Sequence, residues 1–301
     1  MKLGRGGISV SPFFIGVLWG SISPECQGRE TAIKKDTEMI PFRFEEDIVI
    51  YPIADVHLGA LEHNAQAWIA MCHEIQSQPN AKVILAGDLI NNATKTSVSN
   101  VYDEVMRPRE QKKLMVQMLE PIRDNVLCLV GGNHERRSSK DVDDDITFDI
   151  ACKLDLEDLY RENIAFLNIG MGTRMDTGSP NQSYRIAVVH GSGGGIYTGS
   201  AVNRNERFGN VIDGLDCLIV GHTHKGTVSR PGKLVIDAAN NQVVQRDYLV
   251  VSCVSWMEYG GYAAQKMLLP SAHSQPQKLL IRAQHGRNVD RKQQKRIEVV
   301  W

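Results

Sequence analysis

Five short apolar runs, each followed closely by a polar side chain, constrain the fold of this chain more than any other feature. The runs are rich in valine and isoleucine, a composition typical of buried strands. They cover residues 48–54, 83–87, 126–132, 186–189 and 217–221. Because helical patterns lie between several of the runs, the sequence predicts α/β layers in which strands alternate with helices.

Helices and loops are expected between these strands. Asn64 is a suitable N-cap for a helix with one apolar face. Pro108 suits the first turn of a second helix. A third helix is expected over residues 147–159, whereas the polar residues 91–110 and the glycine-rich start of residues 191–210 predict loops.

The side chains that follow the apolar runs are those of metal ligands. Because α/β sheets bind ligands at the carboxyl ends of their strands, we expect these side chains to meet at one place. Asp55 and His57 are two positions apart, and in an extended segment such residues point to the same side. The same geometry is expected for His222 and His224. The full set is Asp55, His57, Asp88, Asn133, His190, His222 and His224.

The chemistry of this set indicates which metals it could bind. Imidazole and carboxylate together favour Mn, Fe, Zn or Co, whereas an all-oxygen set would favour Mg or Ca. Seven ligands are too many for one tetrahedral zinc ion. Two divalent ions that share a carboxylate account for the number, and such pairs lie ~3.5–4 Å apart in two-metal hydrolases. We therefore expect two divalent ions, with Mn first and Fe, Zn or Co as alternatives.

The motifs and their order resemble one known family. They are Asp-x-His at 55–57, Gly-Asp at 87–88, Gly-Asn-His-Glu at 132–135, a lone histidine at 190 and Gly-His-Thr-His at 221–224. With these five motifs in this order, each at the end of a predicted strand, the chain resembles the calcineurin-like metallophosphoesterase family. Each motif alone is common, and their order is what makes the resemblance specific.

The resemblance implies a fold, an activity and a role for each matched position. The fold would be α/β, a layered α-β-β-α sandwich of mixed sheets with the metal site at the carboxyl ends of strands. The activity would be hydrolysis of a phosphoester by a hydroxide that bridges two metal ions. His134 would stabilise the transition state or protonate the leaving oxygen without binding metal. Asp88 would bridge both ions, the first ion would be held by Asp55, His57 and His224, and the second by Asn133, His190 and His222.

The second motif departs from that of the family's phosphoprotein phosphatases, which continue as Gly-Asp-x-x-Asp-Arg. Asn91 and Asn92 stand at the last two positions here. The departure removes a carboxylate that would orient His134 and an arginine that would bind phosphate, so it favours a phosphodiester over a phosphoprotein substrate. The arginines that could replace the missing one are Arg136, Arg137, Arg204 and Arg207, of which Arg136, Arg204 and Arg207 are the predicted substrate-binding residues.

We therefore expect a hydrolase acting on ester bonds, with a phosphodiester as substrate and a nuclease as one form of it. Cationic residues within 91–110 favour nucleic acid, whereas a net charge of −1 and the lack of a recognisable nucleic-acid-binding module argue against it. The alternatives are a phosphomonoesterase for a small or protein substrate and a non-catalytic binding protein on the same fold. A cofactor site at the glycines of 191–195 is disfavoured because the GxGxxG spacing is missing.

The ends of the chain differ in composition from its centre. Residues 1–40 are expected to be a disordered or leader segment, and residues 41–301 a metallophosphoesterase domain with a core at 45–269 and a C-terminal strand extension at 277–301. The apolar stretch at 8–19 resembles a signal peptide, but it is interrupted by proline and glycine and is too short for a membrane span. No two of the six cysteines are spaced as CxxC. We therefore expect a cytoplasmic protein without a membrane partner, with export as the alternative and the oligomeric state left open.

Overall fold

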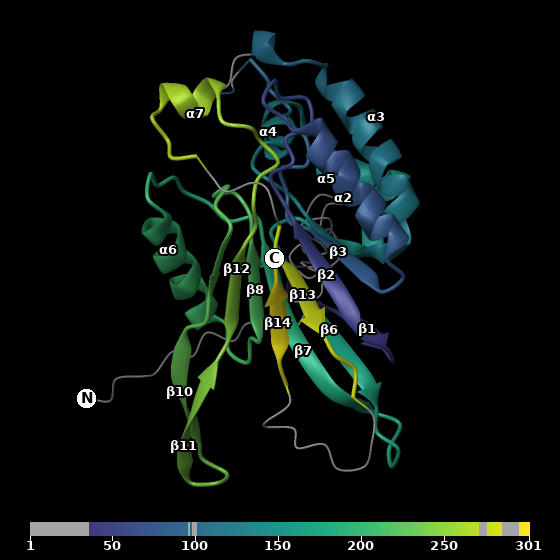
Figure 1. Ribbon diagram of the computed structural model, residues 1–301, viewed down its shortest axis with the longest axis vertical. Helices are drawn as coiled ribbons and strands as arrows, with labels where there is room; N and C mark the ends of the chain where they lie inside the picture. Colours follow the sequence, from purple (N-terminus) through teal and green to yellow (C-terminus); the bar gives the residue numbers. More distant parts are fainter. Residues whose placement is uncertain (1–35, 96, 98–100, 271–275, 285–294) are drawn as a thin grey trace, which may run out of the picture.

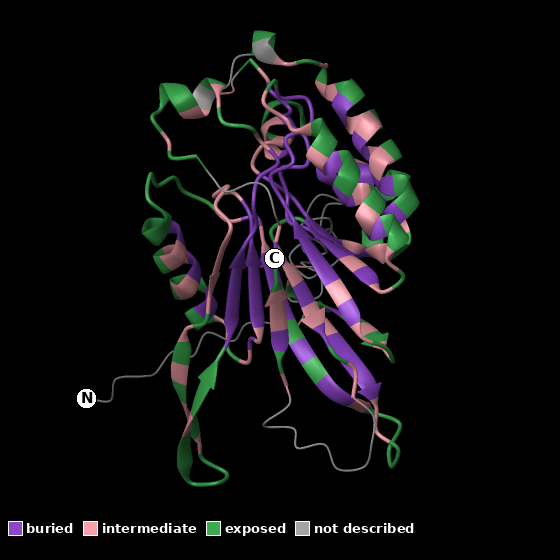
Figure 2. Ribbon diagram, viewed as in Figure 1, coloured by how far each residue is buried: buried purple, intermediate pink, exposed green. Residues whose placement is uncertain are grey.

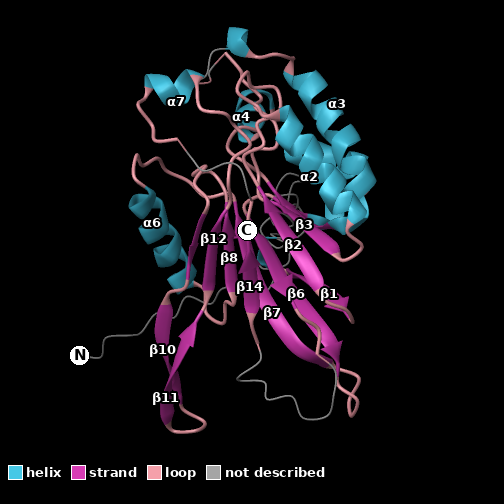
Figure 3. Cartoon of the chain, viewed as in Figure 1, coloured by secondary structure: helices cyan, strands magenta, loops and turns pink. Residues whose placement is uncertain are grey.

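Two six-stranded mixed sheets lie face to face, and helices cover their outer faces (Figures 1 and 3). This arrangement is seen in a computed structural model that describes residues 36–95, 97, 101–270, 276–284 and 295–301. Most of the predicted leader at 1–40 lies outside the described residues. The layers confirm the predicted α/β sandwich of mixed sheets.

The first sheet contains three of the predicted strands in parallel. β2, β3 and β4 are parallel neighbours, and β5 continues the parallel set beyond β4. β13 pairs antiparallel with β2, and β14 pairs antiparallel with β13. In spatial order the strands are β14 (Ile297–Val300), β13 (Lys278–Ile281), β2 (Ile48–Ile53), β3 (Ala81–Leu85), β4 (Val126–Val130) and β5 (Tyr160–Arg161).

The second sheet contains the other two predicted strands. β7, β8 and β12 are parallel neighbours, and β1 runs parallel to β6. A separate two-stranded hairpin of β10 (Gly232–Asp237) and β11 (Gln242–Asp247) projects from the sandwich at the lower left of Figure 1. In spatial order the sheet comprises β1 (Met39–Phe44), β6 (Ile164–Thr173), β7 (Pro180–Val189), β8 (Cys217–Val220), β12 (Leu249–Ser252) and β9 (Thr227–Ser229).

The helices connect these strands. Asn64 caps α2 as predicted, because its side chain accepts a hydrogen bond from the backbone N–H of Ala67 at 2.9 Å. None of the described helices is both long and apolar enough to span a lipid bilayer. The α-helices are α2 (Ala65–Ser77), α3 (Pro108–Leu119), α4 (Arg136–Val142), α5 (Ile146–Lys153), α6 (Thr198–Val211) and α7 (Gly261–Gln265), and the 3₁₀ helices are η2 (Val101–Asp103), η3 (Glu120–Asn125) and η4 (Glu157–Leu159).

Two of the expected connections were wrong. The helix predicted over 147–159 ends at Lys153, because Asp155 has a left-handed backbone with φ 56°, and only a short 3₁₀ helix follows. The loop predicted over 191–210 contains the helix α6. Its buried face consists of Ala201, Asn205 and Gly209, which are small or polar. The sequence therefore shows no apolar residues at helical spacing from which this helix could be predicted.

The buried side chains form three clusters that correspond to the three contacts between layers (Figure 2). The cluster between the two sheets includes Ile50 and Ile219. A second cluster, which includes Trp68 of α2, lies between the first sheet and its helices. The third lies on the α6 side of the second sheet and includes Leu218 and Tyr248. Because the central strands are buried on both faces, their sequences are nearly continuous apolar runs.

Candidate metal centre

The loops that follow the parallel strands of both sheets lie against one another at one end of the sandwich. The backbone N–H of Asp55, after β2, donates to the carbonyl of Gly87, after β3, at 3.0 Å. In the second sheet, the backbone N–H of Gly221 donates to the carbonyl of Val189 at 3.3 Å. The backbone N–H of His222 joins the two sheets, because it donates to both carboxylate oxygens of Asp55 at 3.1 and 2.8 Å. The strand ends therefore meet as predicted.

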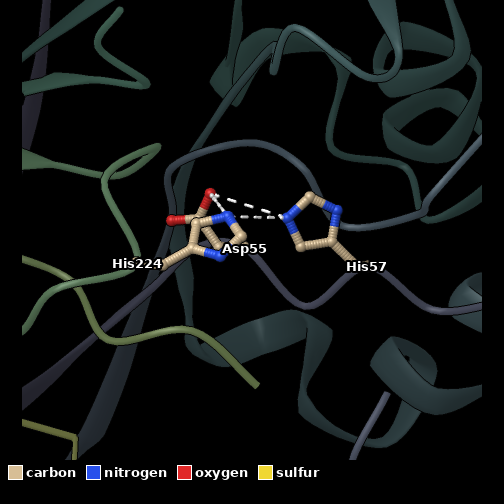
Figure 4. A group of neighbouring side chains, drawn as sticks. All are labelled: Asp55, His57 and His224. Atoms are coloured by element: carbon tan, nitrogen blue, oxygen red, sulfur yellow. Dashed lines mark hydrogen bonds and ion pairs between the residues drawn. The ribbon is translucent and has the colours of Figure 1, made fainter. Parts of the chain in front are cut away.

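Asp55, His57 and His224 form the first group of possible metal ligands, with their ligand atoms within 4.8 Å of one another (Figure 4). The Nε2 atoms of the two histidines are 3.0 Å apart. Oδ1 of Asp55 lies 3.4 Å from Nε2 of His224 and 3.9 Å from Nε2 of His57. Two imidazole nitrogens and a carboxylate thus face one small volume, which suits a divalent cation.

Asp88, His190 and His222 form a second such group, and Asn133 lies among them. Oδ2 of Asp88 is 3.2 Å from Nε2 of His190. The amide oxygen of Asn133 is 2.9 Å from Nε2 of His190 and 2.7 Å from Nδ1 of His222. This second set of donors combines one carboxylate, one amide oxygen and two imidazoles.

Asp88 lies between the two groups. Its Oδ2 atom is 3.2 Å from Nε2 of His190 on one side and 3.9 Å from Nε2 of His57 on the other. The side chain is almost completely buried. A single carboxylate oxygen thus approaches histidines of both groups.

Asp88 and His57 have the charge states that metal binding requires. Burial alone raises the pKa of Asp88, but the nearby imidazoles of His134 and His190 bring the pKa well below its usual range. Burial, together with the neighbouring His134 and His224, lowers the pKa of His57 well below its usual value. An ionised carboxylate and a neutral imidazole are the forms that bind metal ions.

At His190 and His224 the effect of burial is outweighed by the nearby carboxylates: Asp88 raises the pKa of His190 to about 9, and Asp55 raises the pKa of His224. These two imidazoles must therefore lose a proton when they bind a metal ion.

The backbone at the predicted ligands is strained. Ten described non-glycine residues have positive φ, and five of them are predicted ligands. A left-handed backbone costs a non-glycine residue roughly 1–2 kcal/mol, and such residues cluster at functional sites. The five are Asp55 (φ 54°), His57 (φ 48°), Asp88 (φ 53°), His222 (φ 67°) and His224 (φ 55°).

The expectation of extended backbone at these positions was therefore wrong. Asp55 and His57 do reach the same group, but through left-handed turns after the end of β2 at Ile53. His222 and His224 point into different groups instead of the same one. Hydrogen bonds from distant segments hold these turns, so they follow from tertiary structure and not from the local alternation of a strand.

Glu135 holds the turn that carries Asp88, and sequence reasoning assigned it no role. Its buried carboxylate accepts the backbone N–H groups of Asp88 at 3.0 Å, Leu89 at 2.6 Å and Ile90 at 3.1 Å. It also accepts the backbone N–H of Gly132 at 3.1 Å. The signal was present, because Glu135 is the last residue of the Gly-Asn-His-Glu motif.

His134 forms a third group of possible ligands with His57 and Asp88, and both of its ring nitrogens are in contact with other residues. Nδ1 is 2.8 Å from the backbone carbonyl oxygen of Asn91, which takes the place of the missing carboxylate. Nε2 is 2.9 Å from Nη2 of Arg137 and 3.8 Å from Oδ2 of Asp88. The amide of Asn92 points inward, where it donates to the backbone carbonyl of His134 at 2.8 Å.

The arginines considered as substrate-binding residues occupy different places. Nη2 of Arg136 donates to the backbone carbonyls of Gly131 at 3.2 Å and Glu162 at 2.7 Å. Arg204 of α6 lies close to Gly193, in the loop that follows His190, and Arg207 is exposed on the same helix. Arg137, which was not among the predicted substrate-binding residues, is the arginine that contacts His134.

Fold and site together define a metallophosphoesterase. The chain belongs to the calcineurin-like phosphoesterase family, whose model matches residues 48–226. It is therefore a hydrolase acting on phosphoester bonds, and the resemblance found in the motifs is confirmed.

Two similar solved structures are those of bacterial phosphoesterases. One is a conserved uncharacterized protein from Streptococcus pneumoniae TIGR4, described as a predicted phosphoesterase, with 10% identity, coverage of 79% of this chain and 85% of that chain, and a TM-score of 0.33. The other is the calcineurin-like phosphoesterase YfkN from Bacillus subtilis, with 11% identity, coverage of 85% and 91%, and a TM-score of 0.35. No curated protein matches the chain.

Proposed function

We propose that this protein hydrolyses a phosphodiester at a site for two divalent metal ions. The observation that carries the proposal is the position of Asp88, whose Oδ2 atom lies within 4 Å of histidine nitrogens from both ligand groups. A shared carboxylate is what a pair of ions requires to sit close together.

The donor atoms support a specific division of ligands. The first ion is assigned to Asp55, His57 and His224, which form one compact group. Asp88 is assigned to both ions. The second ion is assigned to Asn133, His190 and His222, whose donor atoms lie between 2.7 and 3.3 Å apart.

The mixed set of imidazole, carboxylate and amide donors fits Mn first, with Fe, Zn or Co as alternatives. When bound, the ions polarise the phosphoryl group and lower the pKa of a water molecule so that it can act as the nucleophile.

His134 is assigned to the substrate and not to a metal ion. The carbonyl oxygen of Asn91 can only accept a hydrogen bond, so it holds the proton on Nδ1. Nε2 is then the ring atom that faces the site, 3.8 Å from Oδ2 of Asp88. Once Nε2 has taken up a second proton, His134 contacts a phosphoryl oxygen or delivers that proton to the leaving oxygen, as a general acid does.

The second motif supports a diester over a monoester. Asn92 stands where the family's phosphoprotein phosphatases have arginine, and its side chain is turned away from the ligands toward Ser138, at 3.0 Å. A phosphodiester carries one negative charge on its phosphoryl oxygens, whereas a monoester carries up to two, so a diester needs fewer cations. Nucleic acid is one candidate diester, supported by the cationic residues Arg107 and Arg109 near the start of α3.

The setting of the domain is also a proposal. We assign residues 41–301 to the metallophosphoesterase domain and the protein to the cytoplasm. The assignment to a reducing compartment is supported by Cys128 and Cys217, which are buried within β4 and β8 as small apolar side chains.

The test compares the hydrolysis of bis-p-nitrophenyl phosphate and p-nitrophenyl phosphate by the Mn-loaded protein. The Asp88→Asn variant serves as the blank. We expect preference for the diester, followed by tests on single- and double-stranded DNA, RNA and cyclic nucleotides. A preference for the monoester would make the protein a phosphatase, and hydrolysis of neither compound with Mn, Fe, Zn or Co would overturn the proposed activity.

A further inference from the structure

Arg137 is placed between the ring of His134 and the main chain of Asn91. Its Nη2 atom lies 2.9 Å from Nε2 of His134, and its Nη1 atom donates to the carbonyl oxygen of Asn91 at 3.1 Å. The same carbonyl oxygen is 2.8 Å from Nδ1 of His134. Arginine and histidine thus share one acceptor and contact each other directly.

These contacts determine which nitrogen of His134 carries the proton. A guanidinium group can only donate, so Nε2 of His134 must accept the hydrogen bond from Arg137. Nδ1 then carries the proton and donates it to the carbonyl of Asn91. The guanidinium therefore covers the ring atom that the proposed function assigns to the substrate.

The positive charge of Arg137 has no carboxylate in contact. Within the described part of the chain, no Asp or Glu oxygen lies within 4.0 Å of its guanidinium, although Asp88, Glu135 and Glu104 act on it at longer range. Arg137 is half-buried, on the first turn of α4. Two of its five N–H groups serve the contacts with His134 and Asn91, which leaves donors for an anion.

We propose that Arg137 binds a non-bridging phosphoryl oxygen of the substrate beside His134. It thereby supplies the arginine that the second motif lacks. A planar guanidinium is well suited to phosphate oxygens. The neighbouring Arg136 is directed elsewhere, because its Nη2 atom donates to the carbonyls of Gly131 and Glu162.

The inference rests on the proposed function, because it names a substrate-binding residue of the same site. An anionic oxygen is a stronger acceptor than a neutral imidazole nitrogen. A bound phosphoryl group therefore draws the Nη2–H donor of Arg137 away from His134. Nε2 of His134 is then free to take up a proton and to contact the substrate through it.

The experiment uses Arg137→Ala and Arg137→Gln in the full chain, loaded with Mn. Hydrolysis of bis-p-nitrophenyl phosphate gives KM, and calorimetry gives the affinity for inorganic phosphate. We expect KM to rise and phosphate affinity to fall by roughly 10- to 100-fold, the worth of a hydrogen bond to a charged group. The two metal ions should be retained, because the hydrogen-bond partners of Arg137 in the described part of the chain are Asn91 and His134, and neither is an assigned ligand.

The matched control is Lys140→Ala. Lys140 is exposed on the same helix α4, so its loss removes the same charge without touching His134. Its KM and phosphate affinity should equal those of the wild type. An equal loss in Lys140→Ala would show a general charge effect and would overturn the assignment of Arg137.

The outcomes separate this inference from the proposed function. If the wild type hydrolyses the diester and Arg137→Gln keeps its metals, KM and phosphate affinity, the role of Arg137 is refuted and the function stands. If the wild type hydrolyses neither ester, but the Arg137 variants bind phosphate more weakly than the wild type, the anion site stands and the proposed function fails. If Arg137→Ala loses metal, the KM and phosphate affinity of Arg137→Gln decide whether Arg137 binds the substrate, because glutamine keeps a side-chain donor for the carbonyl of Asn91.

Discussion

The carboxylate of Glu135 accepts the backbone N–H of Asp88 at 3.0 Å, in the interior of the protein and away from solvent. The same carboxylate binds the N–H groups of Leu89 and Ile90, so it holds the left-handed turn on which Asp88 stands. Glutamine at position 135 would place an amide N–H₂ group against these donors. We therefore expect Glu135→Gln to weaken Mn binding roughly 10- to 100-fold, as substitutions behind metal ligands do.

The measurement is the affinity for Mn, determined by titration in a calorimeter. The control is Glu162→Gln, which makes the same chemical change at an exposed side chain. It should leave Mn affinity unchanged. Wild-type affinity in Glu135→Gln would show that the turn is held by other contacts.

Asp88→Asn tests the shared carboxylate. The substitution keeps the shape of the side chain but removes the charge that faces His57 and His190 at 3.9 and 3.2 Å. We expect the loss of at least one metal ion. Substitutions of residues that only support metal ligands reduce activity roughly 10- to 100-fold, and the loss of activity in Asp88→Asn should be greater. Metal content by elemental analysis and the rate with bis-p-nitrophenyl phosphate check this. Two retained ions with full activity would refute the two-metal site.

His134→Ala tests the separation of substrate contact from metal binding. The ring contacts Asn91 and Arg137 and lies 3.8 Å from Asp88, so its removal should leave both ions in place. The rate should fall by about 10²- to 10⁴-fold, the usual contribution of a general acid. The loss should be smaller for p-nitrophenyl esters than for alkyl esters, because p-nitrophenolate leaves without a proton. Metal content that falls together with the rate would make His134 a ligand.

The parts of the site that could be predicted from sequence are those that depend on strands. Strands buried on both faces have continuous apolar runs, so their ends, and the residues Asp55, Asp88 and His222 just beyond them, could be located. The backbone at these residues could not be predicted, because their positive φ values depend on hydrogen bonds from distant segments such as that of Glu135. Periodicity describes local geometry only.

The two neighbouring arginines show a second limit of sequence reasoning. Arg136 and Arg137 are adjacent, and successive side chains on a helix point about 100° apart, from 3.6 residues per turn. Which of them faces His134 depends on where α4 begins and how it packs. The sequence predicts substrate binding by Arg136, whereas in the structure Arg137 is the one that contacts His134.

The helix α6 illustrates a third limit and provides the last prediction. A β-carbon at Gly209 would overlap the ring of Tyr248, which is buried and whose hydroxyl donates to the carbonyl of Glu206 at 2.8 Å. Alanine favours a helix over glycine by up to about 1 kcal/mol, but overpacking a core costs about 1–3 kcal/mol. Because a shift of the buried ring would also strain its hydrogen bond to Glu206, we expect Gly209→Ala to lower the free energy of unfolding by about 1–2 kcal/mol.

The control for Gly209→Ala lies on the same helix. Nothing surrounds a β-carbon at Gly199 within 4 Å, so Gly199→Ala gains helix propensity without overlap. It should leave the free energy of unfolding unchanged or raise it by up to about 1 kcal/mol. Urea unfolding of both variants measures the difference. If Gly209→Ala is as stable as Gly199→Ala, then α6 does not pack on Tyr248 in solution, and the small residues of its buried face do not explain why its sequence lacks an apolar period.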